Sequence, residues 1–489
     1  MTRLCSLLLL VLLVLSSAVA AAAERPDYKQ YQLRLPGDLI DVAVEDLDGD
    51  GLKDIVAFCQ YTKNGSARSV SIFYQKRGGG FGSEPDQSFV IDPEAVVYDI
   101  GDLAKTGRRS ICIMRPDGLY AYELQGRSYN TRPVLLIKTG SIFIQRDAFD
   151  LPRWPLILNS APEPALILVP FVNRVEVFAH NGTGYKATGT LRFPTRTSFM
   201  EEFLMPTGRL SMVTKMPAVS GIAYNSPSGH DLMISMDDNA DIWLRGPSGL
   251  SEGLRFRPGL MEVKKDSDSL EAARVQSVDL TGRGKCDIVV TKMEGGVAQT
   301  KTLVFIYMRR KDGSFPEKPT QTIITEGVIG PRIIDMTGSG RKDIVLPSVK
   351  MGLNNLINML TSKQVNVTVG FYIQQPSGLY PDRPTREKNI NFKLDVSNMG
   401  KNARPVMAFG KFTKGPGMGL AVTSKEDRVS IYMPDRYSVI SDNPGLSLSV
   451  PAPSEIEAVD LNGDGVDDLV MSYKKVKANR KEINVFLSK

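Results

Sequence analysis

The segment DVAVEDLDGDGLKDIV, residues 41–56, joins an apolar alternation, an acidic Gly-rich loop and a short β-branched run. Alternation with a period of two is typical of a β-strand, and the Gly-rich loop interrupts it before a second strand begins. The segment therefore predicts two antiparallel strands joined by an acidic turn. An EF-hand is excluded because it needs flanking helices and a glutamate at loop position 12, which is Ala57 here.

The same unit recurs along the chain. The strongest second copy is IEAVDLNGDGVDDLV at 456–470, and weaker copies are VDLTGRGKCDIV at 278–289 and IDMTGSGRKDIV at 334–345. Decayed copies, and copies indicated by spacing alone, lie at 98–113, 156–169, 222–234 and 406–422. Units of roughly 50 to 75 residues with about four short strands each are typical of propeller blades, whereas solenoid repeats are shorter.

We therefore predict an all-β fold, a β-propeller of eight blades, with seven as the alternative. Residues 24–489 form this single domain, with loops of the DxDxDGxxD type between strands. An extra strand, Tyr31–Leu35, precedes the first unit, and we expect it to pair in one blade with Ile483–Phe486, which removes an open sheet edge. Helical apolar spacing predicts a helical insertion near 351–360.

Loop positions are counted from the first aspartate, which is Asp46 in the first loop and Asp460 in the last. Oxygen-bearing side chains occupy positions 1, 3, 5 and 9 of both loops. Calcium prefers six to eight oxygen ligands, and glycines let the backbone curl around the ion. The alternative is a plain polar turn with Asx hydrogen bonds, which does not explain why several carboxylates converge. The predicted Ca²⁺ ligands are Asp46, Asp48, Asp50, Leu52 (carbonyl) and Asp54 in the first loop, and Asp460, Asn462, Asp464, Val466 (carbonyl) and Asp468 in the last.

The two middle loops are weaker metal candidates. The loop at 335–343 offers only two full charges, so its metal binding is left open. In the loop at 279–287, Arg283 occupies position 5, and a guanidinium cannot ligate a cation. We expect Arg283 to replace the ion by pairing with Asp279 and Asp287.

The first residues predict export. Arg3, the apolar run Leu7–Leu15 and the small residues Ala18-Val19-Ala20 follow the layout of a secretory signal peptide, which we assign to residues 1–23. A membrane anchor is the alternative, but the apolar run is shorter than the ~20 residues that a span needs. We expect a secreted or periplasmic, cell-envelope protein with no integral membrane span after signal cleavage.

Composition excludes several classes. The net charge is +6 over 489 residues, and the basic residues are scattered without aromatic interleaving, so no nucleic-acid partner is expected. Cys59, Cys112 and Cys286 lie in strand-like runs and read as buried small hydrophobes, not as a disulfide framework or metal site. The two histidines, His180 and His230, are far apart, and no catalytic motif was found, so no enzyme is expected.

The units resemble the FG-GAP or VCBS repeats of the integrin α-subunit propeller and its bacterial relatives. The resemblance spans the whole mature chain, and Phe409-Gly410 and Gly415-Pro416 retain a trace of the FG-GAP signature. It implies a calcium-containing ring in a bacterial exported protein, used for binding, adhesion or protein interaction with an extracellular protein or carbohydrate. The alternative function is a propeller enzyme that acts on extracellular polysaccharide.

Overall fold

The structure is a computed structural model of the full chain. The structure describes residues 27–60, 67–144, 150–160, 163–201, 210–225, 231–246, 249–261, 270–295, 300–327, 330–349, 364–393, 406–425, 427–435, 439–474 and 479–489.

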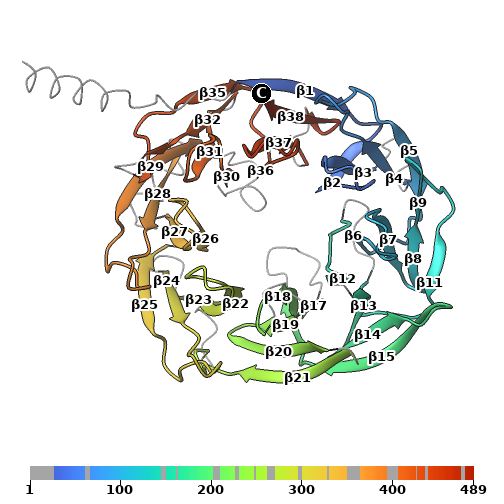
Figure 1. The fold of residues 1–489 in the computed structure, drawn as a ribbon, viewed down its shortest axis with the longest axis horizontal. Coiled ribbons are helices and arrows are strands. Elements are labelled where there is room, and N and C mark those ends of the chain that lie inside the picture. Colours follow the sequence, from blue (N-terminus) through green and yellow to red (C-terminus); the bar gives the residue numbers. More distant parts are fainter. Residues whose placement is uncertain are drawn as a thin grey trace, which may run out of the picture.

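Eight four-stranded antiparallel sheets form a closed ring in this part of the chain (Figure 1). The predicted eight-bladed all-β propeller is therefore confirmed. Each predicted unit supplies the first two strands of one blade. The predicted helical insertion near 351–360 and the predicted signal peptide at 1–23 lie outside the described residues.

The first four blades follow chain order. Blade 1 comprises β2 (Asp38–Glu45), β3 (Asp54–Gln60), β4 (Arg68–Phe73) and β5 (Gln87–Ile91). Blade 2 comprises β6 (Val97–Gly101), β7 (Ser110–Arg115), β8 (Gly118–Tyr122) and β11 (Val134–Ile137). Blade 3 comprises β12 (Ile157–Ser160), β13 (Glu163–Phe171), β14 (Arg174–His180) and β15 (Tyr185–Arg192). Blade 4 comprises β18 (Ala218–Ile222), β19 (Asp231–Met236), β20 (Asn239–Gly246) and β21 (Gly249–Phe256).

The remaining blades continue the ring. Blade 5 comprises β22 (Leu270–Val278), β23 (Asp287–Gly295), β24 (Lys301–Tyr307) and β25 (Gln321–Glu326). Blade 6 comprises β26 (Arg332–Ile334), β27 (Asp343–Ser348), β28 (Gln364–Tyr372) and β29 (Arg386–Lys393). Blade 7 comprises β30 (Met407–Gly410), β31 (Gly419–Lys425), β32 (Arg428–Tyr432) and β35 (Leu446–Ser449). Blade 8 comprises β36 (Glu455–Val459), β37 (Asp468–Ser472), β38 (Glu482–Ser488) and β1 (Tyr28–Arg34).

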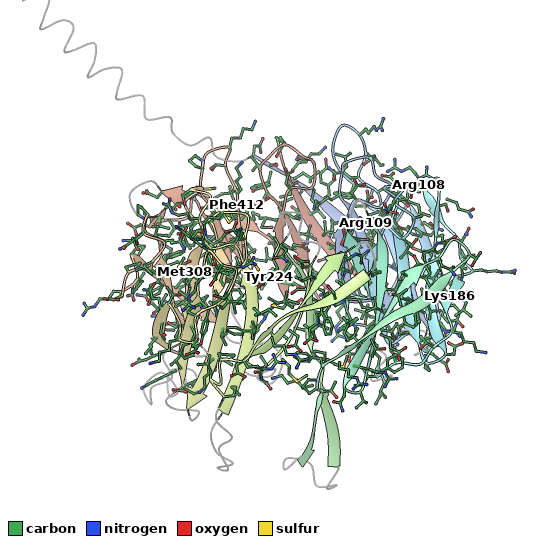
Figure 2. The ribbon with its side chains drawn as sticks, turned by 60° about the horizontal axis from the view of Figure 1, so that its bottom comes forward. Arg108, Arg109, Lys186, Tyr224, Met308 and Phe412 are labelled. Carbon is green, nitrogen blue, oxygen red and sulfur yellow. The ribbon has the colours of Figure 1, made fainter. Side chains whose placement is uncertain are left out.

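Three short hairpins are added to the blades. They are β9 (Leu124–Gln125) with β10 (Ser128–Tyr129), β16 (Arg196–Glu201) with β17 (Leu210–Lys215), and β33 (Pro434–Asp435) with β34 (Val439–Ile440). The green hairpin β16–β17 extends away from the ring (Figure 2). It belongs to the connection from blade 3 to blade 4.

Antiparallel order gives the ring two distinct faces. The loops between first and second strands, which include the acidic loops, lie on what we call the loop face. The connections from each fourth strand to the next blade lie on the opposite face.

Blade 8 closes the ring with strands from both ends of the sequence. β1 pairs antiparallel with β38, with Tyr31 opposite Val485 and Leu33 opposite Ile483. Leu33 is fully buried and packs in the apolar cluster between blades 8 and 1. The predicted closure is confirmed, and it gives β38 a partner on the side that would otherwise be an open edge.

Eight apolar clusters of described residues form the core, one between each pair of successive blades. Strand alternation explains this division, since on β3 Ile55 faces blade 8 and Val56 faces blade 2. Every residue of β3 is buried, as expected for a strand covered on both faces. Cys59, Cys112 and Cys286 are free and buried, as predicted.

Candidate functional site

The acidic loops share one backbone shape set by their first aspartate. In the first loop, the Asp46 carboxylate accepts hydrogen bonds from Gly49 N at 2.8 Å and Gly51 N at 3.0 Å. Asp460 accepts the matching pair from Gly463 N at 2.7 Å and Gly465 N at 2.9 Å. Gly49 and Gly51 have φ of 77° and 89°, which favours glycine.

Weakly acidic loops adopt the same curl. Asp335 accepts from Gly340 N at 2.7 Å, Asp279 from Gly284 N at 2.6 Å, and Asp102 from Gly107 N at 2.7 Å. The loop after Asp102 has no other carboxylate up to Ser110. The Asx hydrogen bonds of the alternative interpretation are therefore present, and they hold this shape with or without a cluster of acids.

Three carboxylates converge in the first loop. Asp46, Asp48 and Asp50 are half-buried and each offers an oxygen within 4.8 Å of the others. Such a group has the chemistry of a hard-cation site, because like charges at this spacing repel unless a cation neutralises them. Arg127, from the turn between β9 and β10, meets this need in part, since its Nε lies 2.9 Å from an Asp48 oxygen.

Asp54 lies apart from this group. It is 1 % exposed, and its two carboxylate oxygens accept hydrogen bonds from Leu47 N at 3.0 Å and Gln75 N at 2.9 Å. Burial raises its pKa to about 7, and the neighbouring Asp48 and Asp50 carboxylates add to the rise. Asp54 thus links the loop to the strand end after β4. Its carboxylate retains lone pairs for a cation.

The same link recurs at the ninth loop position, a role that the sequence argument missed. Asp287 accepts from Leu280 N and Arg309 N, and Asp343 accepts from Met336 N and Gln374 N. Asp468 accepts from Leu461 N at 2.8 Å and Ser488 N at 2.7 Å. The available signal was an aspartate seven residues after a buried apolar loop residue.

The last loop resembles the first and makes an additional side-chain hydrogen bond to the end of β38. Asp464 accepts the Ser488 hydroxyl at 3.0 Å, and the Asn462 amide nitrogen lies 3.4 Å from the same carboxylate. Val466 donates its N–H to Asp464, as Leu52 does to Asp50. The carbonyl ligands predicted at Leu52 and Val466 stay predictions.

The Arg283 side chain forms an ion pair with only one of its two predicted partners, Asp287. Its guanidinium lies 3.4 Å from Asp287, while toward Asp279 it offers only its backbone N–H, at 3.1 Å. Arg283 is half-exposed, so this pair is expected to contribute little stability.

Successive loops are locked together on the loop face. The N–H of loop position 8 donates to the carbonyl of position 2 in the preceding blade, as in Arg109 N to Leu47 O at 2.9 Å and Lys342 N to Leu280 O at 2.8 Å. Lys53 N makes the same bond to Leu461 O at 2.9 Å and so joins blade 1 to blade 8.

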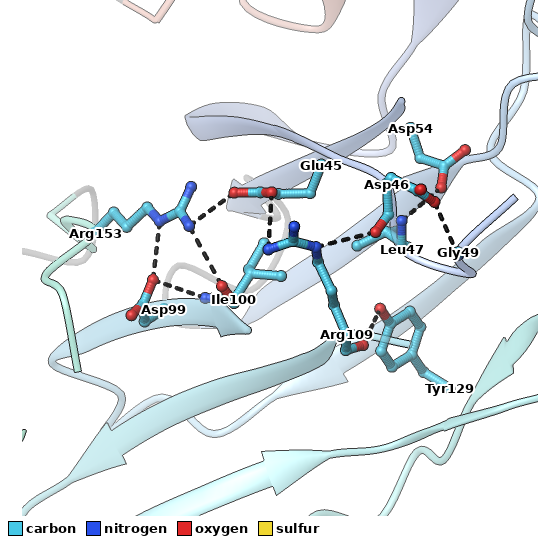
Figure 3. A network of polar contacts seen from close by, with 10 residues as sticks. All are labelled: Glu45, Asp46, Leu47, Gly49, Asp54, Asp99, Ile100, Arg109, Tyr129 and Arg153. Atoms are coloured by element: carbon cyan, nitrogen blue, oxygen red, sulfur yellow. Dashed lines mark hydrogen bonds and ion pairs between the residues drawn. The ribbon is translucent and has the colours of Figure 1, made fainter. Parts of the chain in front are cut away.

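A charged network continues from the first loop into blades 2 and 3 (Figure 3). Arg109 donates to the Asp46 carbonyl at 3.1 Å and pairs with Glu45 at 3.2 Å. Arg153 pairs with Glu45 at 2.8 Å and with the buried Asp99 at 3.0 Å. The first acidic loop and the adjoining end of β2 are thus fixed to blades 2 and 3.

The innermost strands carry further carboxylates, most of them paired. Asp41 pairs with Lys474 at 2.5 Å and accepts the Tyr98 hydroxyl at 2.7 Å. Glu455 pairs with the same lysine at 2.6 Å. Desolvation raises the pKa of Glu457, and the neighbouring Glu455 and Glu45 raise it further.

His180 is the last residue of β14, and its Nδ1 accepts the Gly182 N–H at 3.1 Å from the turn that follows, while His230 is outside the described residues. No helix of the described residues is long and apolar enough to cross a bilayer.

Comparisons with known proteins assign no family to this chain. No family model matches the chain, and no curated protein matches it. The FG-GAP and VCBS resemblance therefore stays a prediction.

Several solved structures share a distant likeness. A lectin of Agrocybe aegerita that recognises non-reducing terminal N-acetylglucosamine is 15 % identical, with a TM-score of 0.38 over 75 % of this chain and 90 % of that one. The V. cholerae biofilm matrix protein Bap1 is 10 % identical, with a TM-score of 0.31 over 96 % and 89 %. The Nup133 β-propeller domain of Vanderwaltozyma polyspora is 12 % identical, with a TM-score of 0.36 over 86 % and 98 %. Likenesses at this level carry no functional argument.

Proposed function

We propose that this chain is an exported binding module, a propeller ring with calcium in its acidic loops that holds an extracellular protein or carbohydrate. The observation that carries the proposal is the convergence of Asp46, Asp48 and Asp50 within 4.8 Å. The predicted signal peptide supports a location outside the cytoplasm, where calcium is abundant enough to fill sites of modest affinity.

The first loop is the stronger metal candidate. Its three converging carboxylates supply the charge that raises calcium affinity, and one Asp54 oxygen is placed at the loop base. In the last loop Asn462 replaces one carboxylate, so we expect weaker binding by Asp460, Asp464 and Asp468. Arg127 must leave Asp48 when calcium enters.

A binding role is favoured over an enzymatic one because most described carboxylates near the innermost strands have fixed partners. Asp41, Glu45 and Glu455 are each paired with an arginine or lysine. Glu457 is the observation that favours the alternative, an enzyme acting on polysaccharide, because a carboxyl with a raised pKa suits a general acid.

The test compares retention with cleavage. The purified mature protein is immobilised and presented with extracellular polysaccharides and envelope proteins, in calcium and in chelator. Calcium-dependent retention without release of shorter products supports the proposal. Release of new sugar reducing ends that Glu457→Gln abolishes would instead establish the enzyme.

A further inference from the structure

A cavity of about 380 Å³ lies between the outer strands of blades 3 and 4. Blade 4 contributes Asp241 and Trp243 from β20, Glu252 and Arg255 from β21, and Arg257 just beyond. Blade 3 contributes Arg192 at the end of β15. This volume is in the range of sites that hold small ligands.

A β-bulge assembles the blade 4 wall. Asp241 pairs in register with Arg255, and Trp243 pairs with Glu252, with a register shift between them. Without the shift, strand alternation would place Glu252 and Arg255 on opposite faces. The extra residue is Gly253, where an added Cβ would meet Ile242 O at 2.9 Å, so the bulge requires glycine.

The charges of the cavity do not balance. Arg257 pairs with the buried Asp241 at 2.6 Å, and Arg255 pairs with Glu252 at 2.5 Å. Arg257 is also held by the carbonyls of Ala240 and Phe256. No described residue forms an ion pair with Arg192, so three guanidinium groups face two carboxylates. The excess charge favours an anionic ligand, and a guanidinium fork suits a carboxylate.

Trp243 adds an apolar surface to the charged wall. Its indole packs against the apolar cluster between blades 3 and 4, and its Nε1–H is buried without an acceptor among the described residues. An indole offers a flat apolar face together with a hydrogen-bond donor. A pyranose ring covers such a face while its hydroxyls reach neighbouring carboxylates and guanidinium groups.

We propose that this cavity is a subsite for an acidic saccharide, a pyranose unit that carries a carboxylate. The Arg192 guanidinium takes the carboxylate, Trp243 takes the ring face, and Glu252 and Asp241 accept from hydroxyls. The inference rests on the proposed binding function and specifies its ligand class. The site lies toward the opposite face of the ring, near the base of hairpin β16–β17, and away from the acidic loops.

The chain has two tryptophans, so Trp154→Phe leaves Trp243 as a specific fluorescent reporter. This protein is titrated at low salt with trigalacturonate and, as a matched neutral ligand, with its methyl ester. We expect saturable fluorescence change with the acid, at least about tenfold weaker binding of the ester, and weakening of acid binding by salt. Equal binding of acid and ester, or no saturable change, would overturn the proposal.

Arg192→Ala tests the assigned cation, and Arg108→Ala is its matched control, since Arg108 is exposed on another part of the surface (Figure 2). We expect about a tenfold loss of affinity for Arg192→Ala, as for removal of a charged hydrogen bond, and none for Arg108→Ala. Unchanged melting of both variants verifies folding. If an intact ring retains polysaccharide and Arg192→Ala retains it equally, the cavity is refuted while the binding function stands. Shortening of trigalacturonate would instead contradict the binding function.

Discussion

Replacing Gly49 or Gly51 of the first loop with alanine distinguishes two contributions to stability. One is the left-handed backbone conformation of each glycine, and the other is the close packing of the first loop against the loop of blade 2. Gly49 and Gly51 both have left-handed φ, so alanine at either is expected to cost about 1–2 kcal/mol in the free energy of unfolding. They differ in surroundings. A Cβ on Gly49 would lie 2.9 Å from Gly107 O in blade 2, whereas a Cβ on Gly51 would meet nothing within 4 Å. The forced separation of backbones should add about 1–3 kcal/mol for Gly49→Ala alone.

Other loops supply replicates and a control. Gly338 repeats the crowded case, with a Cβ 2.7 Å from Gly417 N, and Gly340 repeats the open case. Gly463 holds the position of Gly49 in the last loop, yet its Cβ would meet nothing within 4 Å. The assay is urea unfolding in chelator, so that calcium does not contribute. If Gly51→Ala destabilises as much as Gly49→Ala, or Gly463→Ala as much as Gly338→Ala, contact between loops does not stabilise the ring.

Three further predictions concern metal, closure and pH. Calcium at a hundredfold excess over Kd should stabilise the protein by about 2.7 kcal/mol per site, a shift that Asp48→Ala and Asp464→Ala each reduce; identical melting in calcium and chelator would exclude structural calcium. Leu33→Ala, which opens a cavity beside the closing strand, should cost about 2–5 kcal/mol, whereas the exposed Lys29→Ala should cost almost nothing; equal melting of the two would argue against closure through β1. Because the folded pKa of Asp54 is about 7, above its ordinary value of 3.8, the calcium-free fold binds this proton more tightly, so its stability should fall as pH rises from about 4 through 7; chelated protein whose melting temperature rises over that window would contradict this.

The sequence predicted the ring because propeller blades repeat local information. The apolar alternation and acidic turn that begin blade 1 recur at 456–470, and even units recognised by spacing alone, such as 222–234, became paired strands. The partner of β1 was predictable because a closed ring leaves one strand to be supplied from the far end of the chain.

The roles of individual carboxylates were harder to predict from the sequence than the fold. Asp46 and Asp54 are the same residue type in one motif, but the first curls the loop and the second bonds to strand ends. Which backbone N–H groups lie beside a carboxylate depends on strand register, which a spacing rule does not contain. The cavity at Arg192 and Trp243 depends further on a bulge and on the meeting of two blades.

Closure through β1 also has a consequence for the order of folding. Gln30 of β1 bonds to Asn484 of β38, a partner 454 residues later in the chain. β1 is the edge strand of its sheet and pairs with β38 alone, so it has no sheet to join until the far end of the chain is in place. Contacts of such long range form slowly because their loop-closure entropy is lost before they stabilise anything. A chain that lacks β38 would therefore leave β1 without a partner and would expose the apolar residues that β1 and β38 bury between blades 8 and 1.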